Sequence, residues 1–163
     1  MKSAYFYQCL FFLMALLLIT ESYSQNSVYR QVQAFKSEEG HSVQSNELFR
    51  PDTKSTRSDA MDKVIKKATF LTLNTPELKR LNDSQIDKLQ LKLPYQRENI
   101  ELELIRSQLF TEDFSVITDK SNGKPVQIKQ GAYFRGVVKN DPNSLVTLSI
   151  YDDEVIGIIA SDN

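Results

Sequence analysis

The chain has 163 residues, with 20 Lys and Arg against 21 Asp and Glu, and 40% of its residues are hydrophobic. A predicted leader, residues 1–24, contains one charge of each sign, so the net charge of residues 25–163 stays at −1. This length suits one domain and excludes a large multidomain enzyme. The charge does not direct the protein to nucleic acid or to an anionic membrane surface. The single cysteine, Cys9, lies in the leader, which excludes disulfides and thiolate metal sites afterwards.

The leader has the features of a signal peptide. Lys2 gives a positive start, and Cys9 to Ile19 (CLFFLMALLLI) form an uncharged apolar core. That core fits a signal peptide and is shorter than the roughly 20 residues that span a bilayer. We predict cleavage between Ser24 and Gln25, with an uncleaved membrane anchor as the alternative. The mature protein is therefore expected to be secreted, periplasmic or on the cell surface, and to meet a membrane only through the leader.

Apolar residues are concentrated in the second half of the chain. Residues 25–85 contain 18 apolar positions in 61, whereas residues 86–163 contain 31 in 78. A segment with little apolar surface gains little from ordering its backbone. We therefore predict a flexible lead-in over residues 25–57, a short helical segment over residues 58–85 and a β-rich domain over residues 86–163. The domain is expected to be truncated at its C-terminus.

Two short helices are expected in the middle segment. Ser58 can cap the first, whose apolar face would consist of Met61, Val64, Ile65 and Ala68. Thr75 is a suitable N-cap for the second, because Pro76 would then occupy the first helical position. Leu78 and Leu81 would face inward.

From Asp87 onward, apolar and polar residues alternate, which is typical of strands with one solvated face. The expected strands include residues 89–93, 100–104, 114–118, 126–129, 133–139, 145–151 and 155–159. Lysines on the first and glutamates on the second favour antiparallel neighbours. Turns are predicted at Asn122-Gly123, Asp141-Pro142 and Asp152-Asp153. The pattern predicts a mainly β (α+β) fold: an antiparallel meander or small barrel of about six strands, preceded by one or two short helices and the signal-peptide helix.

The residues that carry chemistry are few. His41, the only histidine, lies in the polar lead-in, so no Ser-His-Asp or Cys-His arrangement and no H-E-x-x-H zinc helix can form. Asp152-Asp153-Glu154 is interpreted as a solvated turn rather than a calcium loop. Glu101 and Glu103 are interpreted as a solvated strand face rather than a catalytic carboxylate pair. We expect no catalytic, cofactor-binding or metal-ligating residue in this chain.

A series of short motifs near the C-terminus is more specific than a sheet requires. The motif residues are Tyr133, Arg135, Gly136, Asp141, Pro142, Ser144, Leu148, Ser149 and Gly157. They lie in the segments YFRGVV, DPNS, VTLSI and VIGII. This order resembles the propeptide of reprolysin/ADAM-type secreted zinc metalloproteases, in a bacterial-like variant, over about residues 86–160.

The resemblance implies a secreted zymogen. Its β-rich prodomain would assist the folding of a metzincin-type peptidase domain in the same chain and keep that domain latent, and the zinc would be held by the peptidase domain. Animal members of the family place cysteines where this chain has Ala132 and Ile150-Tyr151, so their disulfide is absent. With no exported cysteine to bind the zinc, inhibition would be steric or would reside in residues beyond Asn163. From the residues alone, a stand-alone exported β-sheet adhesion or binding module is the alternative.

Overall fold

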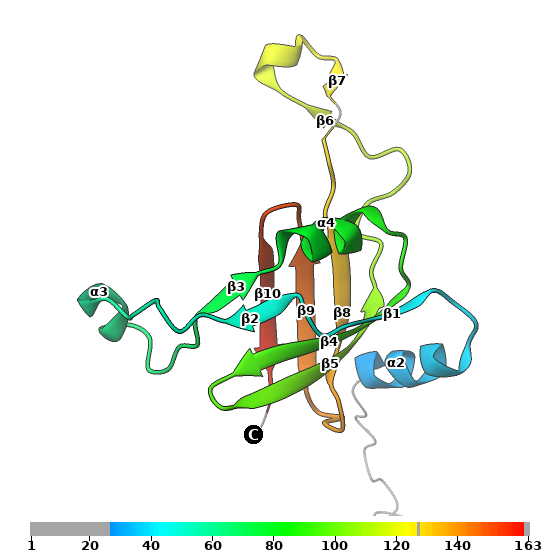
Figure 1. The fold of residues 1–163 in the computed structure, drawn as a ribbon. Helices are drawn as coiled ribbons and strands as arrows, with labels where there is room; N and C mark the ends of the chain where they lie inside the picture. Colours follow the sequence, from blue (N-terminus) through cyan, green and yellow to red (C-terminus); the bar gives the residue numbers. More distant parts are fainter. Residues whose placement is uncertain (1–26, 127, 162–163) are drawn as a thin grey trace, which may run out of the picture.

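The computed structural model describes residues 27–126 and 128–161, and a six-stranded sheet forms its centre (Figure 1). In spatial order the strands are β1 (Ser42–Ser45), β4 (Lys88–Tyr95), β5 (Glu98–Arg106), β8 (Ala132–Val138), β9 (Leu145–Ile150) and β10 (Val155–Ala160). All neighbours are antiparallel except β1, which runs parallel to β4. The mainly β prediction is confirmed. The all-antiparallel and barrel versions are wrong, because the described sheet is mixed and open.

The remaining elements lie outside this sheet. The helices are α2 (Ser27–Ser37), α3 (Asp59–Asp62), α4 (Thr75–Asp83) and the short 3-10 helix η1 (Asp119–Ser121). Two small antiparallel sheets pair β2 (Phe49–Pro51) with β3 (Leu71–Leu73), and β6 (Val116–Ile117) with β7 (Pro125–Val126). The predicted signal peptide and its cleavage site at Ser24 and Gln25 lie outside the described residues.

The main core lies between one face of the sheet and α4. Alternate residues of the strands point to this face, as the period of two predicts. The buried cluster contains Leu48, Leu78, Leu81, Ile86, Leu89, Leu91, Leu102, Leu104, Ala132, Phe134, Val146, Leu148 and Ile150. Leu78 and Leu81 bring α4 into this cluster, as expected. Lys92 lies opposite Glu101 across β4 and β5, which confirms the predicted antiparallel pairing of lysines with glutamates.

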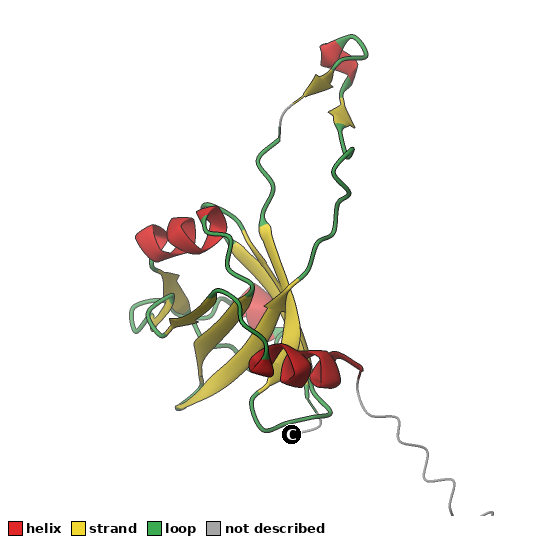
Figure 2. Cartoon of the chain, turned by 90° about the vertical axis from the view of Figure 1, so that its right-hand side faces the viewer, coloured by secondary structure: helices red, strands yellow, loops and turns green. Residues whose placement is uncertain are grey.

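The opposite face of the sheet is partly covered by α2 (Figure 2). Val32 of this helix packs with Ile105 and Val137 in a second buried cluster, joined by Val28 and Tyr29. The expectation that β5 has a solvated face is therefore wrong at Ile105 and at Glu103, which are both buried. The prediction of a loose lead-in over residues 25–57 is also wrong for its described part. That part forms α2, β1 and β2, because its few apolar residues find partners far away in the sequence.

The helical segment is shorter than predicted. Ser58 caps α3 by accepting a hydrogen bond from the backbone N–H of Met61, but the helix ends at Asp62. Val64 is 80% exposed, because its side chain has no sheet face to pack against. The N-cap of α4 is Asn74, one residue before the predicted one, and Pro76 still lies in the first turn. The helix therefore begins where proline chemistry indicates.

The predicted turns form, but one of them lies outside the main sheet. Asn122 and Gly123 have φ values of 49° and 79°, the left-handed conformation expected of this pair. The strands that they join, β6 and β7, form their own two-stranded sheet, so their assignment to the main meander is wrong. At the next turn, the backbone N–H of Ser144 donates to the Asp141 carbonyl oxygen at 3.2 Å, with Pro142 second in the turn.

A polar cluster joins β1 to α4 and gives a pH-dependent prediction. Arg80 donates two hydrogen bonds of 2.8 Å to the Glu77 carboxylate, and Ser45 donates one of 2.7 Å. The bonds from Arg80 lower the pKa of Glu77 below its ordinary value of 4.5. A lowered folded-state pKa stabilises the protein above the unfolded-state pKa, and this contribution is lost as the pH falls towards the folded-state pKa. Glu77→Gln is expected to reduce the free energy of unfolding by about 1 kcal/mol at pH 7.

Urea unfolding at pH 7 and at pH 3 measures this effect. The difference between wild type and Glu77→Gln should shrink at pH 3, because the wild-type carboxyl is then losing its charge. Glu98→Gln, at an exposed residue, is the matched control. An equal difference at both pH values would show that the carboxylate charge does not matter.

Candidate docking surface

The motif residues lie on three adjacent strands and one turn. Tyr133 pairs with Ser149 between β8 and β9, and Gly157 of β10 pairs with Leu148 of β9. Asp141, Pro142 and Ser144 form the β8–β9 turn, and Arg135 and Gly136 lie within β8. The fold thus gathers residues that are dispersed in sequence into one half of the sheet. Their side chains leave on both faces and do not converge on one point.

Two motif glycines lie where another chain segment passes closely. A Cβ at Gly136 would overlap the carbonyl oxygen of Glu103 and lie 2.8 Å from Cα of Leu104. A Cβ at Gly157 would lie 2.6 Å from the Thr147 carbonyl oxygen. Real Cβ atoms essentially never come this close to other atoms. Glycine is therefore required at both positions by the spacing between strands.

The motif serine closes the β8–β9 turn from inside. Ser144 is fully buried, and its Oγ accepts a 2.8 Å hydrogen bond from the backbone N–H of Val138 and donates a 2.6 Å bond to the Asp141 carbonyl oxygen. Ser144→Ala leaves the Val138 N–H without this acceptor, so we expect a loss of about 1 to 3 kcal/mol in the free energy of unfolding. Denaturant unfolding measures it, with the exposed Ser115→Ala as a comparison. No loss would mean that water replaces the hydroxyl.

The face of the sheet that α2 partly covers also carries exposed apolar side chains beyond that helix. We define the docking face as the apolar residues Leu145, Ile156 and Ile158 together with the polar residues Arg135 and Thr147. Their side chains share one face of β8, β9 and β10. Ile156 is 55% exposed and Ile158 is 70% exposed. Apolar side chains gathered on an open sheet face mark an interaction surface more often than isolated ones do. The docking face is therefore the first candidate for contact with a partner.

The backbone of β10 adds hydrogen-bonding capacity to this surface. The backbone N–H of Tyr151 donates to the Glu154 carbonyl oxygen at 2.9 Å, so these residues form a hydrogen-bonded antiparallel pair. Such pairs alternate along a ladder, which directs the N–H and C=O groups of Val155, Gly157 and Ile159 away from β9. In the described sheet, β10 is an edge strand and contains no charged residue. An edge of this kind is a template for another strand.

A second projecting feature connects β5 to β8. We call residues 107–126 and 128–131 the arm. Antiparallel neighbours such as β5 and β8 need only about two to five residues to connect them. The arm instead extends far from the sheet and ends in the β6–β7 hairpin (Figure 2). Long connections in compact domains usually have a function of their own or are disordered; this one has internal structure.

The outgoing side of the arm is anchored to the sheet by aromatic rings. Phe110 stacks on Phe114 with centroids 4.2 Å apart, and the edge contact between Phe110 and Tyr133 is 5.8 Å. Tyr133 meets Tyr151 in a further edge contact at 6.2 Å. Such pairs prefer stacked or edge-on geometries and contribute beyond the area that they bury. The motif residue Tyr133 therefore connects the arm to the end of β9.

The returning side of the arm is anchored by an ionic cluster. Lys129 Nζ lies 2.8 Å from a carboxylate oxygen of Asp83 in α4 and 2.8 Å from one of Asp152. The hydrogen bonds that Lys129 donates to Asp152 and Asp83 raise the pKa of Lys129, and the bonds that Asp152 accepts from Lys129 and Asn82 lower the pKa of Asp152. Asp152 therefore holds the returning side of the arm and is also part of the β9–β10 turn.

Within residues 27–126 and 128–161, no group of three or more His, Cys, Asp or Glu side chains could hold a metal ion.

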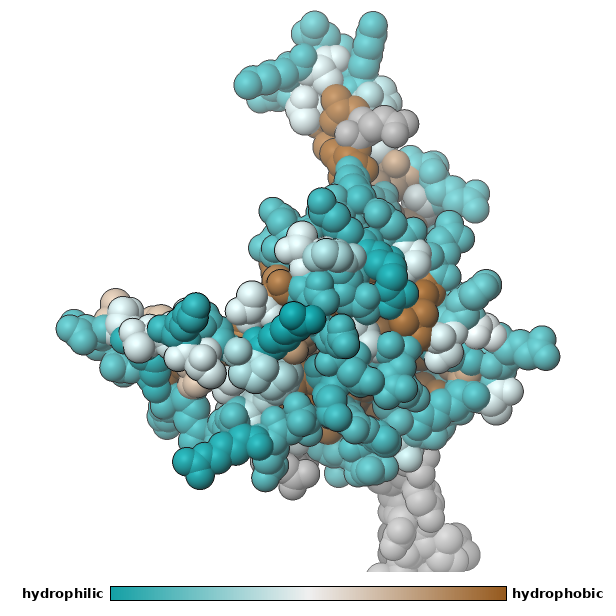
Figure 3. All heavy atoms as spheres, in the orientation of Figure 1, coloured by the Kyte–Doolittle hydropathy of each residue, from teal (hydrophilic) through white to brown (hydrophobic). Residues whose placement is uncertain are grey.

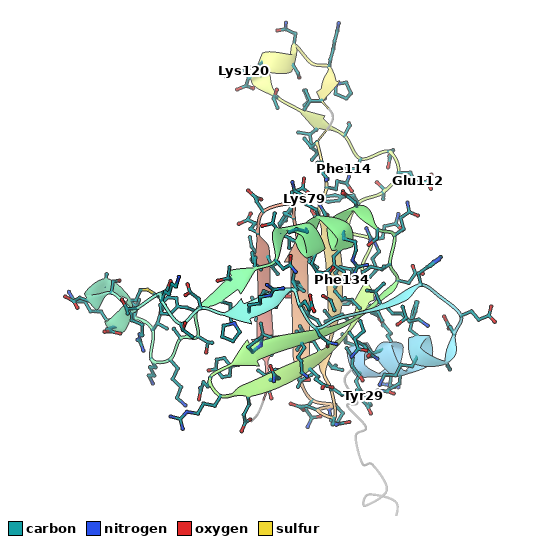
Figure 4. The ribbon with its side chains drawn as sticks, in the orientation of Figure 1. Tyr29, Lys79, Glu112, Phe114, Lys120 and Phe134 are labelled. Carbon is teal, nitrogen blue, oxygen red and sulfur yellow. The ribbon has the colours of Figure 1, made fainter. Side chains whose placement is uncertain are left out.

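The arm exposes apolar side chains along its length. Ile117 is 59% exposed, and Leu109, Phe114 and Ile128 are also exposed. Figure 3 shows apolar surface on the arm between the polar tip and the body of the protein. Figure 4 places Lys120 at the tip and Phe114 nearer the sheet. The arm therefore combines a fixed base, an apolar middle and a charged tip.

A cavity of about 510 Å³ lies beside the C-terminal end of α2. Its walls include Phe35, Lys36, Lys88 and Glu103. Glu103 is buried and pairs with Lys36 at 2.7 Å. Glu101, which was interpreted with Glu103 as part of a solvated strand face, instead binds Lys139 at 2.6 Å. His41 is exposed in a loop, as expected.

The sequence did not lead us to expect the arm or the burial of Glu103 beneath α2. The distance in sequence between Arg106 and Ala132 was a signal for the arm, because two strands of an ordinary meander do not need so long a connection. The buried Glu103 had no comparable signal.

Neither a protein-family model, nor a curated protein, nor a solved structure matches the chain. Among the described residues, no helix has the length and apolar character needed to cross a membrane.

Proposed function

We propose that this chain is the propeptide of a secreted metzincin-type zinc metalloprotease and acts as the latency and folding segment of a peptidase domain in the same parent protein. The motif order from Tyr133 to Gly157 supports this proposal through its resemblance to reprolysin/ADAM-type propeptides. The observation that carries it is the docking face, an exposed apolar surface beside the uncharged edge of β10. The chain itself would perform no catalysis, and the zinc would belong to the peptidase domain.

A propeptide requires a preformed surface rather than a reactive group. Association costs roughly 4 to 15 kcal/mol in translational and rotational freedom. A covalent connection lowers this cost, because it gives the partner a high effective concentration. Apolar contacts of Ile156 and Ile158 and strand pairing at β10 would supply the binding energy. The same surface would assist folding by giving the peptidase domain a template.

The coding sequence that follows Asn163 tests this proposal first. An H-E-x-x-H-x-x-G-x-x-H helix downstream is the expected result. A stop codon at that point would contradict the proposal. The parent zymogen then provides the functional test: before processing, it should hydrolyse a quenched fluorescent peptide at least tenfold more slowly than the processed enzyme does.

Substitution of the docking face adds a structural test. Ile158→Lys in the zymogen should reduce the secreted yield and raise the activity before processing, because a charge would be buried in the contact. Val64→Lys is the matched control, since Val64 is also apolar and exposed but lies near α3, away from the docking face. Equal behaviour of the two variants would contradict a role of this face.

A stand-alone exported adhesion or binding module is the second candidate. The cavity beside α2 favours it, because about 510 Å³ is within the range of small-ligand sites. A stop codon after Asn163, together with secretion of the chain alone, would favour this candidate. In either case, purified residues 25–163 are expected to show no hydrolase activity, and turnover that survives metal chelation would contradict this expectation.

A further inference from the structure

We infer that the arm is the element that enters the substrate cleft of the peptidase domain and blocks it, whereas the docking face supplies the binding energy. This inference rests on the proposed function and deepens it. The chain has no cysteine outside the leader that could bind the zinc. Within residues 25–163, any contribution to latency would then have to be steric, and the arm projects far beyond the sheet of the described structure (Figure 2).

Contacts at the base of the arm fix its direction relative to the sheet. Phe110 and Phe114 fix the outgoing side on Tyr133, and Lys129 fixes the returning side on Asp83 and Asp152. These anchors come from α4, β8 and the β9–β10 turn, so both sides are tied to the rigid part of the fold. A positioned element loses less conformational freedom on binding than a loose loop does. The structure therefore presents the arm in one direction.

The middle of the arm has the character of a cleft ligand. Ile117 and Ile128 are exposed on the two sides of the hairpin. Extended segments with exposed backbone groups and apolar side chains are what a cleft that binds peptides as strands recognises. Next to them, Pro125 of β7 has no backbone N–H to donate, and its ring fixes its own φ. The arm can therefore fill an apolar groove.

The tip of the arm differs from a substrate. Asn122 and Gly123 are both left-handed, and Thr118 and Ser121 close the preceding turn with reciprocal hydrogen bonds. A peptide bond in this closed turn is not extended, so it does not match a cleft that binds substrates as strands. Asp119, Lys120 and Lys124 keep the tip solvated. The arm would thus occupy the cleft without being cut there.

Protection of the Lys120 amine from acetylation tests the inference without any substitution. In the isolated chain Lys120 is exposed, so an amine-acetylating reagent should modify it rapidly. In the latent parent zymogen, the modification should be at least tenfold slower, and a peptide hydroxamate that fills the cleft should restore it. Lys67 is the control, because it is exposed near α3 and should be modified equally in both forms. Equal modification of Lys120 in both forms would overturn the inference.

Two variants of the parent zymogen separate this inference from the proposed function. Replacing residues 115–127 with Gly-Ser-Gly-Ser keeps Phe110, Phe114 and Lys129, and should raise the activity before processing at least tenfold. Ile117→Asp with Ile128→Asp, which keeps the length of the arm, should raise it in the same direction. Secreted yield within twofold of wild type shows that both variants fold.

The outcomes are distinguishable. A latent wild-type zymogen whose arm variants stay equally latent would overturn the role of the arm and leave the propeptide function intact. A wild-type zymogen that is as active as the processed enzyme would overturn both.

Discussion

A Gly136→Ala variant is expected to lose most of the stability of the sheet. The added Cβ would overlap the Glu103 carbonyl oxygen and lie 2.8 Å from Cα of Leu104, and both neighbours are backbone of β5. Backbone cannot rotate away as a long side chain can, so β5 and β8 would have to separate. We expect a loss of roughly 3 to 5 kcal/mol in the free energy of unfolding, the upper range for one substitution.

Urea unfolding, followed by circular dichroism, measures this loss. Gly123→Ala is the matched control: Gly123 has a positive φ but no atom within 4 Å of an added Cβ, so only backbone strain remains. That strain should cost about 1 kcal/mol. Equal stability losses in the two variants would show that the close approach of β5 to β8 is not the reason for glycine in the motif.

The second large effect is expected at the ion pair beneath α2. Glu103 is 7% exposed and Lys36 is 43% exposed, with 2.7 Å between Nζ and the carboxylate oxygen. Lys36→Met would leave a buried carboxylate without its partner. A fully buried pair loses roughly 3 to 5 kcal/mol in this way, and the partial exposure of Lys36 reduces our expected value to about 2 kcal/mol. Denaturant unfolding at pH 7 measures it.

A double variant decides whether the charge or the packing matters. Replacing both members, Lys36→Met with Glu103→Leu, removes the unpaired charge and should restore the stability to within about 1 kcal/mol of wild type. Lys88→Met, in the same cavity wall but without an ion pair to Glu103, should have a much smaller effect. If the double variant is no more stable than Lys36→Met, the loss comes from packing of α2.

The strand order of the second half could be predicted well, because the alternation along each strand shows which of its residues face the core. Leu89 and Leu91, and likewise Leu102 and Leu104, alternate with polar residues, and short turns fix which strands are neighbours. The segments around Val116 and Val126 have similar local patterns, but they pair only with each other. Their pattern predicts a strand and does not say which sheet it joins. The arm was therefore missed although its turn was correct.

The candidate surface was only partly predictable. The motif from Tyr133 to Gly157 could be selected from the sequence, and the structural reasons for Gly136 and Ser144 follow from spacing between strands and from burial. Sequence alternation gives Ile158 the same weight as Ile150. Only the neighbours distinguish them, because Ile150 belongs to the core cluster while Ile158 lies beyond α2 on an edge strand.

The sequence by itself determined the local features: the left-handed Asn122-Gly123 pair, the turn from Asp141 to Ser144, the start of α4 and the alternation along the strands. These depend on backbone preferences and on residues a few positions apart. The tertiary structure decided that α2 covers Glu103, that the arm leaves the sheet, and that Ile156 and Ile158 stay exposed. Those outcomes depend on which distant segment packs against each face, and no local pattern contains that information.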